Sequence, residues 1–318
     1  MRIPVHRRFV IDSLNFFIKK FLRLLLTVFI VSTLIFIILR VVPGDPANVI
    51  AGIDADKESV EQIRRRLGTD RPLHVQYFSW IGQVVRFDLG ESFISRQPVK
   101  DLIFERFPLT FTLAIMGISI AILLAVPLGI LSAVKRWTFW DYGGMLFSQA
   151  GMAIPGFWLG ILLLLLIAAY FPAFPLFGGD SFHHLLLPAF ALGFARAAAL
   201  LRLTRASMIE ELSKEYITTA RAKGLTPFLI KYKHALKNGL IPVITFAGIQ
   251  FGYLLGGAII IEQVFSLPGL GRLLLFAVYQ RDFPLIQGGV IFIAIIFSLI
   301  NFFVDILYSL LNPKIKLE

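Results

Sequence analysis

The chain has 318 residues, of which 57% are hydrophobic and 16% are charged, and its mean hydropathy is +0.78. This composition is too apolar for an ordinary water-soluble domain and indicates a membrane protein. The formal net charge is +11, but the positions of the charges favour topogenic residues beside anionic lipid over nucleic-acid binding. The sequence contains no cysteine, which excludes disulfides, thiol nucleophiles and thiolate metal sites.

Six long runs with few or no charged residues are candidate membrane spans. A spanning helix needs roughly 20 mainly apolar residues, and the runs are Leu24–Leu39, Phe107–Val134, Tyr142–Gly179, Ser181–Leu201, Asn238–Ile261 and Phe283–Val304. The third run contains Pro155, and we expect its helix to close near Phe171. The sequence therefore predicts an all-α membrane protein with six transmembrane helices.

Basic residues gather in alternate connections between these runs, which the positive-inside rule assigns to the cytoplasm. They precede the first span, follow the second and fourth spans and recur in the C-terminal tail, whereas the connection Phe171–Phe182 has none. We therefore expect both termini to be cytoplasmic. The basic N-terminus leads into the first span without a small-residue cleavage site, which favours a retained helix over a signal peptide.

The connection 43–106 lies outside by this alternation and is long enough to need its own structure. The stretch Ser59–Gln62 fits a capping box that opens a short helix, which Gly68 would close. Apolar residues recur at helical spacing over Leu73–Val84, which predicts a second helix lying on the protein or at the membrane interface. We expect a small external helical region that either receives a partner delivering cargo or caps the helix ends.

The most distinctive cytoplasmic segment is Glu215–Val243, which is polar and basic and lies between two spans. Gly224 can supply a left-handed stop for one short helix. Thr226 can cap a second helix, and Pro227 suits its first position. We expect two short helices joined at an elbow, forming a bent finger on which a partner can dock. The expected parts of the chain are the cytoplasmic N-terminus with the first span (1–42), the external region (43–106) and a five-helix core with its cytoplasmic loop (107–318, loop about 206–239).

Ionisable residues near the membrane interior are few. They are Arg196 and Arg202 in the fourth span and Asp305 in the sixth. Because a charge in hydrocarbon is costly, we expect Arg202 and Asp305 either to form a buried ion pair or to extend to the cytoplasmic surface. A proton or sodium relay needs more carboxylates near the midplane than this chain offers.

Three glycines in the fifth span, Gly248, Gly252 and Gly256, recur every four residues and share one helical face. Small residues at this spacing let another helix approach closely. The face is expected either to pack against a neighbouring helix of the same chain or to lie at a moving or pathway-lining interface.

Catalytic motifs are absent from the sequence. It contains no phosphate-binding loop, no H-E-x-x-H and no G-x-S-x-G. The adjacent His183 and His184 lack further ligands, so no metal or cofactor is expected on this chain. This argues against an intramembrane enzyme. A standalone secondary transporter would show an inverted repeat, which is not evident, and a membrane scaffold for cytoplasmic partners remains open.

The stretch EYITTARAKGL followed by KYKHALKNGLIPVIT resembles the cytoplasmic coupling loop of ABC importer permeases, in the variant found in oligopeptide and dipeptide permeases. The general loop has a Glu-Ala-Ala triplet, three further residues and a glycine. Aligned on Gly224, the triplet falls on Thr218, Thr219 and Ala220, and its first two positions depart from the pattern as they commonly do in peptide-type permeases. The stretches LRVVPGDPAN, FDLGESFISRQPVKDLIFERFPLTFTLA, LPGLGRLLLFAVYQRDFPLIQG and FFVDILYSLLNPKIK resemble other parts of the same family in the same order.

This resemblance covers nearly the whole chain and implies the type I ABC importer permease fold, here as the first, B-type subunit. It implies ATP-driven, binding-protein-dependent import of peptides across the bacterial inner membrane, with nickel chelates or glutathione-like solutes as alternative cargo. The implied partners are a second related permease, two ATPase subunits that use ATP and Mg, an external solute-binding protein and membrane lipids, but no nucleic acid. The implied coupling residues are Glu215, Tyr216, Ala220, Arg221, Ala222, Lys223, Gly224, Leu225, Thr226 and Pro227.

Overall fold

The computed structural model describes residues 5–42, 44–52, 54–171, 178 and 181–311. Within these ranges the secondary structure is helical, and the only β-type pairing is an isolated bridge between Glu91 and Pro98. Five of the described helices are long and apolar enough to span a membrane, and a bent pair of helices makes a sixth span if it is counted as one. The predicted all-α membrane architecture is confirmed.

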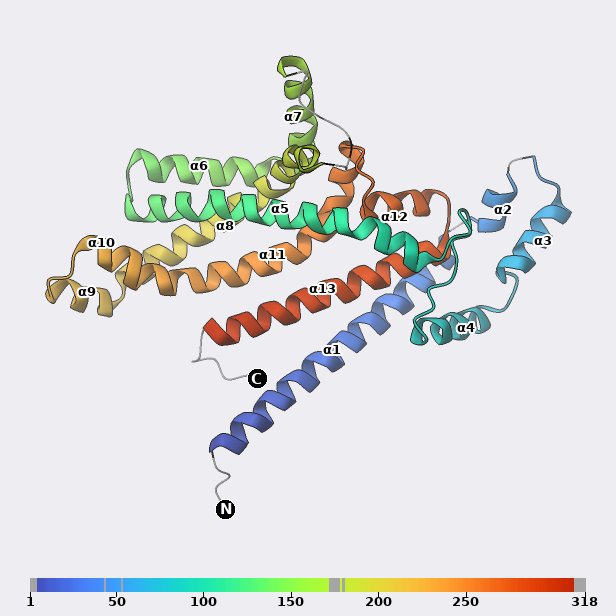
Figure 1. The fold of residues 1–318 in the computed structure, drawn as a ribbon, viewed down its shortest axis with the longest axis horizontal. Helices are drawn as coiled ribbons and strands as arrows, with labels where there is room; N and C mark the ends of the chain where they lie inside the picture. The colour runs from blue at the N-terminus through green and yellow to red at the C-terminus, as the bar shows by residue number, and fades with distance from the viewer. Residues whose placement is uncertain (1–4, 43, 53, 172–177, 179–180, 312–318) are drawn as a thin grey trace. The chain divides into compact units, whose positions relative to one another are not determined.

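The elements follow one another along the chain as drawn in Figure 1. They are α1 (Val5–Val41), α2 (Pro46–Ala51), α3 (Lys57–Leu67), α4 (Leu73–Val85), α5 (Val99–Val134), α6 (Phe139–Ala153), α7 (Gly156–Tyr170), α8 (Phe182–Ser213), α9 (Glu215–Ala222), α10 (Pro227–Leu229), the π-helix η1 (Ile230–Ala235), α11 (Leu236–Val264), α12 (Leu270–Tyr279) and α13 (Phe283–Leu311). They form two compact units, one made of 1–16, 111–267 and 299–318 and the other of 17–110 and 268–298.

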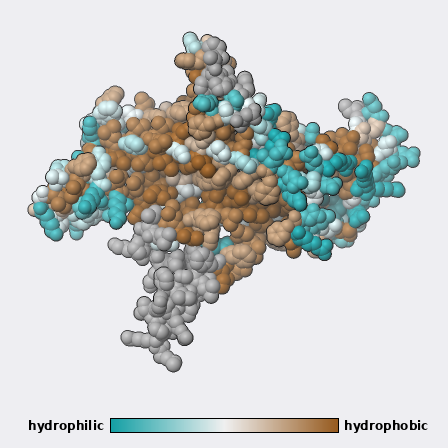
Figure 2. Space-filling model, viewed as in Figure 1, coloured by the Kyte–Doolittle hydropathy of each residue, from teal (hydrophilic) through white to brown (hydrophobic). Residues whose placement is uncertain are grey.

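In the first unit, α8 packs against α6, α7 and α11. Its contact with α5 depends on small residues, because a Cβ added at Gly193 would lie 2.4 Å from the carbonyl oxygen of Gly117. Small residues allow this close approach of two backbones. The surrounding core consists of Ala121, Ala125, Ala197, Leu200, Leu201, Val243 and Ala247. In Figure 2, hydrophobic side chains cover much of the surface over these helices, and hydrophilic side chains gather around α9 and α10.

The third predicted span is broken, so the expectation of one continuous helix was wrong. Helices α6 and α7 meet at an angle of 100°. Ile154 adopts an extended backbone with ψ 118°, and Pro155 immediately precedes α7. A proline disfavours the helical conformation in the residue before it and cannot donate a hydrogen bond to the preceding turn. Pro155 therefore ends one helix and positions the next.

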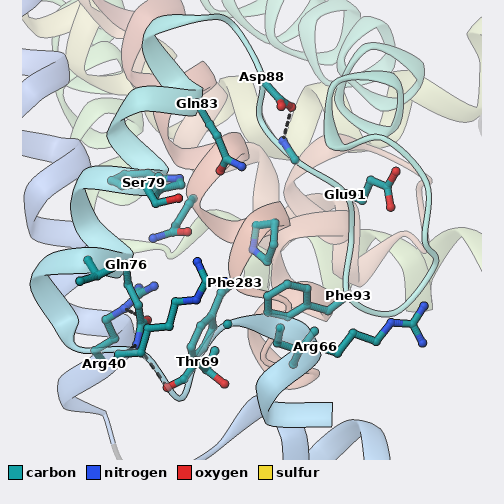
Figure 3. A pocket seen from close by; sticks show the side chains of 18 of the residues that line it. Arg40, Arg66, Thr69, Gln76, Ser79, Gln83, Asp88, Glu91, Phe93 and Phe283 are labelled. Carbon is teal, nitrogen blue, oxygen red and sulfur yellow. Dashed lines mark hydrogen bonds between the residues drawn. The ribbon is translucent and has the colours of Figure 1, made fainter. Parts of the chain in front are cut away.

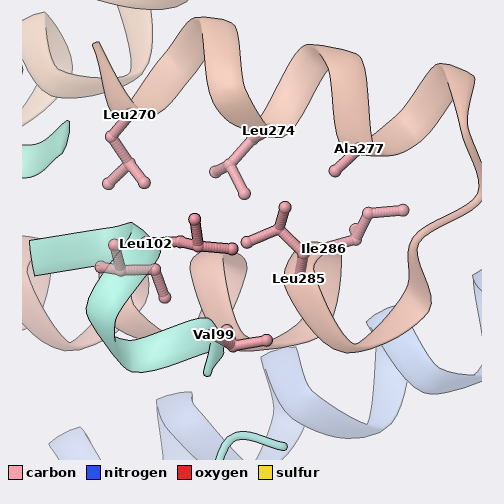
Figure 4. Close-up of a cluster of buried hydrophobic side chains, with 8 residues drawn as sticks. Val99, Leu102, Leu270, Leu274, Ala277, Leu285 and Ile286 are labelled. Atoms are coloured by element: carbon pink, nitrogen blue, oxygen red, sulfur yellow. The ribbon is translucent and has the colours of Figure 1, made fainter. Parts of the chain in front are cut away.

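The second unit has its own hydrophobic core, shown in Figure 4. The first turns of α5 pack against α12 and the start of α13, through Val99, Leu102, Ile103, Leu270, Leu274, Ala277, Leu285 and Ile286. The start of α12 is tied to α5 because the Leu270 amide donates a 2.9 Å hydrogen bond to Thr110 Oγ1. These residues belong to segments that are about 160 positions apart in the chain.

The helices of the 43–106 connection confirm part of the sequence prediction. Gly68 closes α3 in the left-handed conformation, at φ 69°. The helix begins earlier than the proposed capping box, however, because the Asp56 carboxylate is the cap and accepts a 2.7 Å hydrogen bond from the Ser59 amide. The predicted second helix is α4, and it lies on the protein itself. The Tyr77 and Trp80 rings lie 5.0 and 5.7 Å from the Phe36 ring of α1.

Candidate functional site

The finger predicted from the sequence is defined here as residues 215–235, which comprise α9, the turn after it, α10 and η1. The turn has the predicted left-handed glycine, with Gly224 at φ 78°. The Gly224 amide donates to the Arg221 carbonyl at 2.9 Å, and the Leu225 amide donates to the Ala220 carbonyl at 3.3 Å. Nothing lies within 4 Å of a Cβ added at Gly224. The turn therefore needs glycine for its backbone conformation and not for space.

The second half of the elbow starts as predicted. Thr226 caps α10, its hydroxyl accepting a 3.4 Å hydrogen bond from the Leu229 amide, and Pro227 occupies the first helical position. The prediction that this second helix is short was wrong, however. Helix continues without interruption from Pro227 to Val264. The lysines after Ile230 favoured a loop, but residues 228–238 contain neither glycine nor proline and the helix runs through them.

This continuous helix contains a π-turn, η1, in which the Leu236 amide donates to the Lys231 carbonyl five residues earlier. Such turns insert one extra residue into a helix and frequently occur at functional sites. No sequence pattern predicted this turn.

One face of the finger is anchored to the first unit. Ile217, Ala220, Ile230 and Ala235 are each less than 9% exposed and pack in one cluster with Met208. The cluster also includes Ile130 and Ala133 of α5. Burial of this apolar surface holds the finger against α5 and α8.

A polar cluster fastens α9 to the helices on either side of it. The Tyr216 hydroxyl donates a 2.7 Å hydrogen bond to Glu211 of α8 and accepts one of 3.3 Å from the Asn238 amide of α11. Lys214 bonds to the same Glu211 carboxylate. Partial burial raises the pKa of the Tyr216 phenol, and the bond to Glu211 raises it further. That carboxylate also raises the pKa of Lys214.

The opposite face of the finger is open. Among the coupling residues implied by the resemblance, Ala220 is buried and Leu225 is half-buried, whereas the following are exposed: Glu215, Tyr216, Arg221, Ala222, Lys223, Gly224, Thr226 and Pro227. Ala220 therefore anchors the finger and does not face a partner.

Sequence reasoning left two aromatic residues out of the site. Phe228 is 68% exposed and Tyr232 is 44% exposed, and their ring centroids lie 4.8 Å apart. The signal was an aromatic pair at i and i+4 within a basic segment. An exposed aromatic pair in a segment that also exposes basic residues is typical of a protein-docking surface.

A buried ion pair lies in the same unit, but not where the sequence predicted one. Asp141 of α6 is fully buried, and Arg205 of α8 donates to it from Nε at 2.6 Å and from Nη2 at 3.0 Å. Ser132 Oγ and the Trp137 amide also donate to this carboxylate. Arg202 is exposed and Asp305 is half-buried, and the pairing of these two residues stays a prediction.

The glycine repeat of α11 does not form one uniform face. A Cβ added at Gly248 would lie 2.3 Å from Val304 Cγ2 of α13, and Gly252 is buried. Gly256 is exposed, with nothing within 4 Å of an added Cβ. The first two positions suit packing within the chain, and the third is available to another molecule.

No group of three or more His, Asp or Glu side chains suited to holding a metal ion occurs within the described ranges. The finger has one buried, apolar face, and its exposed residues precede a helix long enough to span a membrane.

The comparisons with known proteins agree with this geometry. Residues 125–317 match the family described as "Binding-protein-dependent transport system inner membrane component", and residues 13–114 match the N-terminal family of the same membrane component. The glutathione transport system permease protein GsiC of Escherichia coli O6:H1 is 44% identical over 303 residues, which cover 95% of this chain and 99% of that protein. The protein of the same name from Salmonella choleraesuis is 43% identical over the same shares.

Solved structures show the same fold at low sequence identity. A chain of the inward-facing MetNI methionine ABC transporter has a TM-score of 0.54 and 19% identity, covering 66% of this chain and 96% of its own length. A chain of an amino acid ABC transporter solved with histidines has a TM-score of 0.52 and 14% identity, covering 68% and 95%. These values support the type I ABC importer permease fold. The chain therefore belongs to the family of inner-membrane components of binding-protein-dependent transport systems, as a multi-pass permease subunit of an ABC importer.

Proposed function

We propose that the finger is the element through which this permease receives mechanical work from an ATPase subunit. The observation that carries the proposal is the two-sidedness of the finger. Its inner face is fixed by Ile217 and Ile230, and its outer face presents Phe228, Tyr232 and Arg221. A helix held rigidly on one side and exposed on the other can seat in a groove of a partner.

Force on the finger has a direct route into the membrane. Because Pro227–Val264 is one continuous helix, displacement of its first turn displaces the rest of α11. The polar cluster around Glu211 transmits the same displacement to α8. ATP and Mg are bound by the partner subunits, and this chain binds neither.

The proposed complex contains this chain, a second related permease, two cytoplasmic ATPase subunits and an external solute-binding protein. Family membership implies the ATPases and the binding protein. The basic residues of the finger and of the N-terminus support placing both on the cytoplasmic side. The connection 43–106 then faces the binding protein.

The proposed cargo is a short peptide. Relatives at 44% identity over nearly the full length are named for glutathione transport, and glutathione is itself a small peptide-like solute. Identifying the compound that the cognate binding protein retains would distinguish among peptides of two or more residues, glutathione-like compounds and nickel chelates. Selection among them resides in that protein.

Site-specific cross-linking tests the docking role of the finger. Because the chain has no native cysteine, Ala222→Cys introduces a single thiol on the exposed face of the finger. In native membranes, a thiol-to-amine cross-linker at this position is expected to capture an ATPase subunit. The matched control is Ser59→Cys, an exposed position on α3, which should capture none. Capture of no ATPase from position 222, or equal capture from both positions, would contradict the proposal.

A further inference from the structure

A cavity of about 860 Å³ lies in the second unit. It is bounded by the end of α1, the turn after α3, one side of α4, the 88–100 segment and the start of α13. Figure 3 shows Gln76, Ser79 and Gln83 along the cavity side of α4, with Phe93 and Phe283 across from them. Helix α4 therefore has one side on this cavity while its Tyr77 ring packs on α1.

The lining of this cavity is strongly basic. It includes five cationic side chains against two carboxylates, and these residues are Arg40, Arg66, Arg71, Arg96, Lys100, Asp88 and Glu91. Arg40 is held by Gln76 and by the face of Phe36. None of the other four cations forms an ion pair within the described part of the chain. Uncompensated charge of one sign around a concave wall concentrates counter-ions inside it.

A buried donor also lines the cavity. Gln287 of α13 is only 3% exposed, and its Nε2 atom has no hydrogen-bond partner within the described ranges. Leaving a buried N–H group unpaired is costly, and such a group in a native protein calls for a specific explanation. An acceptor entering the cavity would satisfy it.

The segment 88–100, which carries Arg96, is fixed by hydrogen bonds within the protein. Asp282 accepts a 2.5 Å hydrogen bond from Ser92 Oγ and a 3.0 Å bond from the Phe93 amide. Arg96 itself has a left-handed backbone, at φ 61°. The Asp282 carboxylate is buried and is not among the residues that line the cavity.

The geometry points to a binding site for a phosphate group, with Gln287 as the buried donor and Arg66, Arg96 and Lys100 as the charge partners. Guanidinium and ammonium groups that line one cavity suit phosphate oxygens. Nothing in the proposed coupling role of the finger requires this site.

The phosphate can come from a phospholipid headgroup or from a soluble anion, and the place of the cavity favours the lipid. Arg40 is the penultimate residue of the span Ile18–Val41, so the cavity begins where the hydrocarbon core ends. A second, mostly apolar cavity of about 380 Å³ shares Arg40 and is lined by Phe36, Ile37, Tyr77 and Phe78. This groove suits part of an acyl chain.

The test uses the purified full-length permease, stripped of lipid in detergent, with two probes. Phosphatidylglycerol retention is measured by native mass spectrometry, and inorganic phosphate binding by the shift in melting temperature at constant ionic strength. The triple variant Arg66→Gln/Arg96→Gln/Lys100→Gln is expected to weaken binding of the responding probe at least tenfold, since each cation near a lipid surface contributes about fivefold.

The matched control removes the same charge from the same region outside the cavity. Lys57, Arg65 and Arg86 are exposed and do not line it, so the variant carrying glutamine at all three should bind as the parent does. Gln287→Leu should weaken binding severalfold. Gln287→Glu, which adds a negative charge, should weaken it further. Melting temperatures of the ligand-free variants confirm that they fold.

The outcomes separate cleanly. A response to phosphatidylglycerol that is lost in the triple variant identifies a lipid site, and a response to inorganic phosphate alone identifies a soluble anion. Equal loss in the triple variant and its control would reduce the effect to general charge and overturn the site. If no variant changes the response to either probe, the site is also overturned. The same holds if the triple variant impairs docking of a binding protein but leaves the binding of both probes unchanged.

Discussion

The carboxylate of Asp141 is fully buried and accepts hydrogen bonds from Nε and Nη2 of Arg205, at 2.6 and 3.0 Å. The pair joins the first turn of α6 to α8. Paired geometry of this kind is the strongest form of a charge-assisted hydrogen bond. It holds three helices next to the base of the finger.

Removal of one member of this pair should destabilise the permease strongly. Arg205→Met leaves the Asp141 carboxylate buried without its cation, at a cost of about 3–5 kcal/mol, and the melting temperature should fall. The double variant Arg205→Met/Asp141→Leu should recover a large part of the loss, because it leaves no uncompensated charge. A double variant that is less stable than the single one would contradict this account.

Replacement of Gly224 should uncouple transport while the complex still assembles. Gly224→Val forces a β-branched residue into a left-handed backbone at φ 78°, with a cost of at least about 1–2 kcal/mol. Reconstituted complexes should show ATP hydrolysis that no longer depends on cargo, or uptake reduced at least tenfold. Gly224→Asn is the control, since asparagine tolerates this conformation, and it should retain most of the uptake. Full uptake by the valine variant would remove the turn from the mechanism.

The aromatic pair of the finger should matter for coupling but not for stability. Phe228→Ala and Tyr232→Ala remove side chains that are 68% and 44% exposed, so the melting temperature of the isolated permease should change little. If they are anchors in an ATPase groove, each should weaken association by about 1–2 kcal/mol or more. Phe87→Ala, at a 90% exposed position elsewhere, is the control and should leave association unchanged. Unchanged ATPase association in all three variants would exclude the pair as an anchor.

The polar cluster should give Tyr216 an unusual titration. Its pKa lies above the ordinary value of 10.0 because of burial and its bond to Glu211. Subtracting the ultraviolet absorbance of Tyr216→Phe from that of the parent isolates this phenol, which should ionise at higher pH than a free tyrosine. In a Glu211→Gln background the curve should move back toward 10. A curve at the ordinary position in the parent would contradict the structure of the cluster.

The same shifts set the sign of a pH effect on the finger. Both Tyr216 and Lys214 have raised pKa values in the folded protein. Their contribution to its stability is therefore fully present below the unfolded values and is lost as the pH rises through the folded ones. Contact between α9 and α8 should weaken only at strongly alkaline pH, and uptake should not change with pH near neutrality through the ionisation of this cluster.

Substitution by alanine should lower the stability of the permease at Gly248 but not at Gly256. A Cβ at Gly248 lies 2.3 Å from Val304 Cγ2, so Gly248→Ala should lower the melting temperature by the equivalent of about 1–3 kcal/mol. Adding Val304→Ala should restore part of that loss. Gly256→Ala should be neutral in the isolated permease, and a loss of assembly or uptake would place Gly256 at an interface with another subunit. Equal destabilisation by both alanines would contradict the described packing.

Local signals predicted the elements better than they predicted where those elements end. Gly68, Gly224 and Thr226 act as the caps that their residue types suggested, because capping depends on a few neighbouring atoms. The break at Pro155 was underestimated, since an apolar run reads the same whether or not its helix is bent. The second helix of the finger is longer than predicted, because charged residues favour a loop in the sequence but do not interrupt this helix.

Long-range pairs could not be read from the sequence at all. Asp141 and Arg205 are 64 positions apart, and Ser92 and Asp282 are 190 apart. Each charged residue had several possible partners, and only the fold selects among them. The resemblance to importer permeases covered the chain and was confirmed at the level of the family. It did not indicate that Ala220 faces inward or that Phe228 faces outward.

The π-turn at η1 changes how positions on the long helix should be compared. One additional residue is accommodated there, so the azimuth of every side chain before Ile230 is offset by about 100° from the value extrapolated from α11 by ideal α-helical periodicity. A helical wheel drawn through the whole segment would assign Phe228 and Leu229 to the wrong sides. A probe position chosen by helical periodicity across this point must therefore allow for the extra residue. Otherwise the probe will lie on a different face of the helix from the one intended.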